Sequence, residues 1–70
     1  MNARLAVREN ELMVRQLIEG AESLATRKGI TIEEAIIFRA DVSIKYAKSD
    51  SAKAAWEIRK DQALNQVSNH

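Results

Sequence analysis

Few side chains in this sequence are of the types that carry out catalysis. The chain has no cysteine, and its one histidine, His70, is the final residue. Nucleophilic catalysis needs a well-placed base, and zinc-type sites need several thiolates or imidazoles. The neighbouring carboxylates Glu9–Glu11 and Glu33–Glu34 are typical of a solvated helix surface. We therefore expect no enzyme activity, no cofactor, no metal site and no small-molecule substrate.

Basic side chains gather near residue 48, where they could contact phosphates or an acidic partner. Lys45, Lys48 and Lys53 lie there, with Arg59 and Lys60 farther along. However, eleven basic residues against ten acidic ones give a net charge of only +1. Dedicated nucleic-acid binders are usually far more basic. A solvated charged surface is the favoured interpretation, and a nucleic-acid partner is the weaker expectation.

The composition favours helices. Hydrophobic residues make up 46% of the chain and charged residues 30%, with no proline and two glycines, which is typical of a folded helical protein. Seventy residues predict a single helical domain over 1–70. No apolar run reaches the ~20 residues that span a membrane, and MNARLAVREN lacks the apolar segment of a signal peptide. We expect a cytoplasmic protein that does not enter a membrane.

Apolar residues recur with helical spacing in three segments, over about residues 3–28, 31–48 and 51–67. Gly29 is placed to end the first helix in a left-handed conformation. Thr31 and Glu34 have the spacing of a capping box at the start of the second helix, and the residues SDS at 49–51 offer caps for the third. The predicted fold class is therefore all-α, a compact three-helix protein.

The second segment has more apolar surface than its neighbours can cover. The first helix carries its apolar residues on one broad face: Ala3, Ala6, Val7, Met13, Val14, Leu17, Ile18, Ala21, Leu24 and Ala25. The second is apolar around most of its circumference, so we expect it to be the central helix. Ile37, Ala40 and Ile44 lie on the side that is left over. This surplus favours a helical homodimer, which would also help so short a chain to fold.

Six apolar residues are candidates for a dimer or partner interface: Leu5, Leu12, Ile37, Ile44, Tyr46 and Trp56. Leu5 and Leu12 lie on the outer side of the first helix, and Trp56 is expected to anchor the third helix. Asn10 falls within the apolar stripe of the first helix. We favour a solvated position for it, and the alternative is a buried asparagine pair that fixes the register of two copies.

Two stretches resemble DNA-binding proteins. LATRKGITIEEAI, at 24–36, resembles the turn of a helix-turn-helix motif. ARLAVRENELMVRQLIEGAESLATRKGITIEEAI, at 3–36, resembles a ribbon-helix-helix repressor, which implies a strand that directs Arg4, Ala6 and Arg8 into the DNA groove. Glu33 and Glu34 count against the helix-turn-helix, because they would face phosphates there. Against the ribbon, the apolar spacing continues through residues 3–8 as on a helix.

The absence of catalytic groups and the surplus of apolar surface together favour a function in binding. We expect a small non-enzymatic regulatory protein that binds another protein as an inhibitor or adaptor, of the kind found as bacterial, phage or plasmid accessory proteins. The alternative is a dimeric DNA-binding repressor of the ribbon-helix-helix or helix-turn-helix type.

Overall fold

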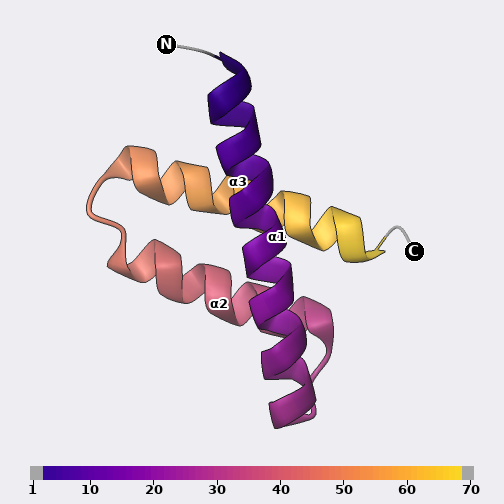
Figure 1. Cartoon of the computed structure of the whole chain (residues 1–70). Helices are drawn as coiled ribbons and strands as arrows, with labels where there is room; N and C mark the ends of the chain where they lie inside the picture. The colour runs from indigo at the N-terminus through magenta and orange to yellow at the C-terminus, as the bar shows by residue number, and fades with distance from the viewer. Residues whose placement is uncertain (1–2, 69–70) are drawn as a thin grey trace.

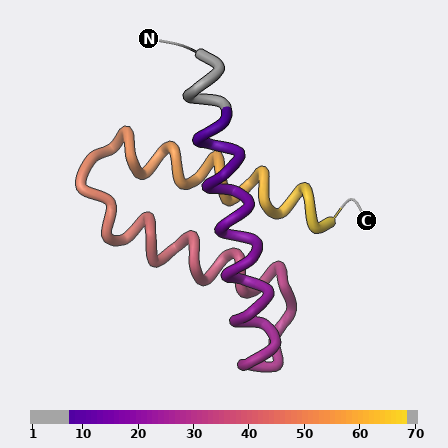
Figure 2. Tube along the Cα trace, viewed as in Figure 1, coloured from indigo at the N-terminus to yellow at the C-terminus, as the bar shows by residue number. Residues whose placement is uncertain are grey.

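The computed structural model describes the backbone of residues 3–68 and the side chains of residues 8–68. It contains three helices, α1 (Ala3–Lys28), α2 (Ile32–Tyr46) and α3 (Asp50–Ser68). Helices α2 and α3 lie side by side and run in opposite directions, and α1 crosses both of them (Figures 1 and 2). The prediction of a compact all-α fold of three helices is confirmed, with boundaries that differ from the predicted ones by two residues at most.

Gly29 ends helix α1 as the sequence predicts. Its φ angle is +69°, in the left-handed region that favours glycine. The backbone N–H groups of Gly29 and Ile30 both donate to the carbonyl oxygen of Ala25, at 2.8 and 3.2 Å. Ile30 then packs against the core. The turn therefore reverses the chain while a helix-end carbonyl keeps its hydrogen bonds.

Side-chain caps begin the other two helices. The backbone N–H of Glu34 donates to Thr31 Oγ1 at 3.1 Å, and the Thr31 hydroxyl donates to Glu34 Oε1 at 3.1 Å. The two residues thus interact in both directions, although the carboxylate binds the hydroxyl rather than the Thr31 backbone N–H of a standard capping box. Of the residues at 49–51, Ser49 is the cap of α3, because its Oγ accepts from the Ala52 N–H at 3.1 Å.

We expect Thr31→Ala to lower the free energy of unfolding by about 1 kcal/mol, because the Glu34 N–H loses its acceptor. Urea unfolding followed by circular dichroism measures this loss. Thr26→Ala is the matched control, since Thr26 donates only to the Glu22 carbonyl within α1 and alanine is the better helix former. A Thr31→Ala protein as stable as the wild type would contradict this role for the cap.

The described part of the chain has a core of nine residues, and five of them are alanines. The core consists of Val14, Leu17, Ala21, Leu24, Ala25, Ala35, Ile36, Ala40 and Ala63. Helix α1 supplies five of these residues from the face that the sequence predicts. Because alanine buries little surface, this core is small even for a chain of this length.

Each of the three helices contacts both of the others, so these contacts do not single out α2 as the central helix, and much of its apolar surface is exposed. Its buried residues are Ala35, Ile36 and Ala40. Helix α2 does expose the predicted surplus of apolar surface, but of the three residues predicted to form it only Ile37 is exposed. Ala40 is completely buried and Ile44 is half-buried, whereas Phe38 and Val42 are exposed. Helix α1 crosses α2 at an angle (Figure 1) and so covers only part of its length.

Candidate interaction surface on helix α2

Three large apolar side chains stand in a row along the exposed side of α2. Phe38, Val42 and Tyr46 are 59%, 41% and 71% exposed. Residues four apart lie on the same side of a helix, one turn above another. The three side chains therefore form a continuous strip about 12 Å long, at 1.5 Å of helix rise per residue, which we call the apolar ridge.

A cleft lies at the start of the apolar ridge, where the end of α1 meets the beginning of α2. It encloses about 340 Å³ and is lined by Leu24, Lys28, Ile30, Glu34 and Phe38. Leu24 is buried and Ile30 is half-buried, so they give the cleft an apolar lining. Lys28 and Glu34 are exposed and charged. We call this hollow the ridge cleft; its lining combines apolar side chains with one positive and one negative charge.

Charged residues of both signs flank the apolar ridge. Glu34 is one turn before Phe38, and Lys45 lies at the other end with its Nζ 5.8 Å from the centre of the Tyr46 ring. Asp41, which lies between them in sequence, forms an ion pair with Lys60 of α3 at 3.3 Å. That pair ties Asp41 to α3. An incoming partner would therefore meet Glu34 and Lys28 at the cleft end of the ridge and Lys45 at the other end.

The structure does not gather the six predicted interface residues into one surface. Leu12 on α1 is 51% exposed and Ile37 on α2 is 40% exposed, as predicted for both. Ile37 and Ile44 are seven residues apart and share a face of α2, which is not the face of the ridge. Tyr46 belongs to the ridge. The side chains of Leu5, Arg4 and Ala6 lie outside the described residues, and Arg8 is exposed.

Trp56 has the anchoring position that the sequence predicts. It is half-buried on α3, and the Arg59 guanidinium lies 4.9 Å from the centre of its ring. Trp56 also lines a narrow space together with Met13 and Leu17 of α1 and Arg39 of α2. Its indole therefore lies where the three helices meet, and a partner would find little of it accessible.

Sequence reasoning missed Phe38 and Val42 as surface candidates. The signal was present, because Phe38, Val42 and Tyr46 have the spacing of one helix side. It was hidden by the many other apolar residues of the same helix, any of which could have been the exposed ones.

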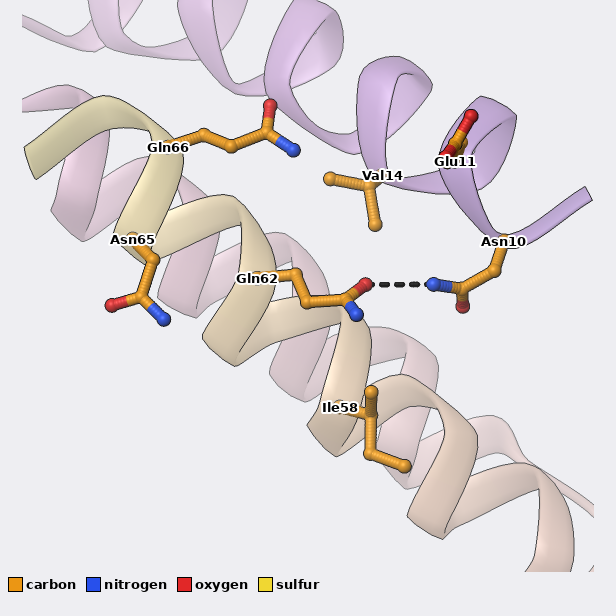
Figure 3. A pocket seen from close by; sticks show the side chains of 7 residues that line it. All are labelled: Asn10, Glu11, Val14, Ile58, Gln62, Asn65 and Gln66. Carbon is orange, nitrogen blue, oxygen red and sulfur yellow. Dashed lines mark hydrogen bonds between the residues drawn. The ribbon is translucent and has the colours of Figure 1, made fainter. Parts of the chain in front are cut away.

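A second hollow lies between α1 and α3, shown in Figure 3. This groove encloses about 680 Å³ and is lined by Asn10, Glu11, Val14, Ile58, Gln62, Asn65 and Gln66. Asn10 Nδ2 donates to Gln62 Oε1 at 2.7 Å, and Arg59 Nε donates to Asn10 Oδ1 at 3.1 Å. Asn10 thus joins α1 to α3 within one chain; its side chain is half-buried, and its bond to Gln62 lies at the exposed surface.

Helix α1 includes residues 3–8, where the ribbon-helix-helix resemblance requires a strand. Residues 3–68 contain no strand at all. The turn that the helix-turn-helix resemblance requires is present at Gly29, between α1 and α2. However, Glu33 and Glu34 are exposed in the first turn of α2, the turn that such motifs insert into the major groove, and their charge repels phosphates.

Among the residues that the structure describes, no group of three or more histidines, cysteines and carboxylates is close enough to hold a metal ion. None of the described helices is both long enough and apolar enough to cross a membrane. In comparisons with known proteins, this chain matches no protein family, no characterised protein and no solved structure with significance.

Proposed function

We propose that this chain is a small, non-enzymatic regulatory protein that acts by binding another protein as an inhibitor or adaptor. The observation that carries the proposal is the exposure of Phe38, Val42 and Tyr46 along one side of α2. An amphipathic helix that lays such a row into a partner's groove is a recurrent mode of protein recognition.

Burial of the apolar ridge would favour binding. Burying a large apolar side chain fully contributes about 1.5–3 kcal/mol, and three such side chains stand in the ridge. Tyrosine, with tryptophan and arginine, is frequent among the residues that dominate interface energies. The charged Glu34 and Lys45 at the two ends suit a polar rim that sets orientation. Such a ridge favours a protein partner over a nucleic acid.

Phe38→Ser is the direct test of this surface. We expect it to weaken capture of the partner about tenfold or more, because the loss of a buried aromatic side chain costs more than 1.4 kcal/mol. The measurement is affinity capture from a lysate of the source organism, with the retained protein identified and quantified by mass spectrometry. Ile58→Ser is the matched control, since Ile58 is 55% exposed on α3 and lies outside the ridge.

The same experiment decides between this proposal and the DNA-binding alternative. One protein retained in near-equal amount after nuclease treatment, and lost with Phe38→Ser alone, supports a role in protein binding. If everything that is retained disappears with nuclease, a dimeric DNA-binding repressor becomes the better function. Equal capture by the wild type and Phe38→Ser would remove the ridge as the binding surface.

A further inference from the structure

The apolar ridge carries a protruding side chain at one end and a hollow at the other. Tyr46, at the carboxyl end of α2, is 71% exposed. The ridge cleft, lined by Leu24, Ile30 and Phe38, opens at the amino end of the same helix. Twelve residues separate Glu34 of the cleft from Tyr46, which is about 18 Å along the helix axis. A phenol ring has an apolar body and a polar tip, and the lining of the cleft has both apolar and charged side chains.

We propose that the apolar ridge binds the ridge of a second copy of this chain, with the two α2 helices antiparallel and each Tyr46 in the ridge cleft of the other copy. This inference rests on the proposed function, because it takes the ridge as the binding surface, and it makes the second copy a competitor of any other protein for that surface. A two-fold symmetric interface uses the same surface patch on both copies, so each contact between the copies forms twice. Tyr46 and the ridge cleft meet this requirement, because antiparallel pairing places the carboxyl end of one α2 beside the amino end of the other.

The charges beside the ridge favour the same arrangement. Glu34 lines the cleft, and Lys45 immediately precedes Tyr46. When Tyr46 of one copy enters the cleft of the other, its neighbour Lys45 comes close to Glu34 on the α2 side of the cleft, while Lys28 lines the α1 side. Symmetry forms the contact between Lys45 and Glu34 twice. Parallel pairing would instead place glutamate beside glutamate and lysine beside lysine, which like-charge repulsion opposes.

The small core gives the second copy a role in stability as well. Five of the nine core residues are alanines, and chains of this length often gain the missing apolar burial from oligomerisation. Pairing the two ridges would bury six large apolar side chains, Phe38, Val42 and Tyr46 from each copy.

Light scattering after size exclusion tests the pairing, over about 10–200 µM of the full chain because dimerisation follows mass action. We expect the wild type to have twice the mass of one chain. Glu34→Lys and Lys45→Glu should each weaken the dimer about tenfold or more, because each turns two attractive contacts into repulsive ones. An equimolar mixture of the two variants should recover the dimer mass, since the reversed charges then oppose each other in the mixed pair.

Glu33→Lys and Lys53→Glu are matched controls that make the same charge changes at exposed positions off the ridge, and both should stay dimeric. Circular dichroism of every variant checks that the helices are intact. A monomeric wild type would overturn the second copy as partner, as would a mixture of the variants that gains no mass. Either result leaves the proposed function standing if Phe38→Ser still abolishes capture of another protein, so the two failures are distinguishable.

Discussion

Replacing Ile36 with alanine is expected to leave much of the chain unfolded at room temperature. Ile36 is completely buried and is the largest of the fully buried side chains. Replacing a buried isoleucine with alanine lowers the free energy of unfolding by about 2–5 kcal/mol, because apolar contacts are lost and a cavity stays behind. A core of this size seldom supplies more than about 3–5 kcal/mol in total. The single change therefore removes most or all of the stability.

Urea unfolding followed by circular dichroism measures this effect, with all proteins at one concentration so that self-association does not change between samples. Ile37→Ala is the matched control, because it makes the same substitution at the next residue, which is 40% exposed. We expect a loss of about 1 kcal/mol or less for the control. If Ile36→Ala unfolded at nearly the same urea concentration as wild type, the packing described for α2 would be wrong.

Much of the fold is predictable from the sequence because its signals are local. The stripe of α1 recurs with helical period, and Val14, Leu17 and Leu24 from it are buried as predicted. Gly29 and Thr31 mark the turn through their own backbone and hydroxyl groups. Such contacts join residues at most five positions apart, so the sequence contains both partners side by side.

The exposed side of α2 was not predictable, because it depends on where α1 crosses. Ala35 and Val42 are seven residues apart and lie on the same side of the helix. Nevertheless, Ala35 is completely buried whereas Val42 is 41% exposed. Helix α1 covers the first half of α2 and leaves the second half uncovered (Figure 1). Periodicity gives the direction of a side chain but not the position along the axis at which a neighbour crosses.

The contacts of Asn10 were hidden for a similar reason. Its partners, Gln62 and Arg59, are 52 and 49 residues away, and the sequence alone does not bring α1 and α3 together at that point. An asparagine in an apolar stripe indicates that some polar partner is needed. Only the packing of the helices shows that the partners come from the same chain.

Ala21→Leu is expected to lower the free energy of unfolding by about 1–3 kcal/mol, because it adds methylene and methyl groups where the core has no space. Ala21 is completely buried on the face of α1 that packs on the other helices, and alanines of α2 and α3 belong to the same core cluster. Small side chains let helix axes approach closely. A larger side chain at this position must push α1 away from α2 and α3 and weaken the contacts between them.

Ala54→Leu is the matched control, because Ala54 is exposed on α3 and leucine is nearly as good a helix former as alanine. Its urea unfolding should stay within about 0.5 kcal/mol of wild type. Should Ala21→Leu prove as stable as the wild type or more so, the three helices would have room between them, and the alanines would reflect helix propensity alone. Destabilisation confined to Ala21→Leu would instead mean that close approach of the helices at Ala21 contributes to the stability of this small fold, in addition to the burial of Ile36.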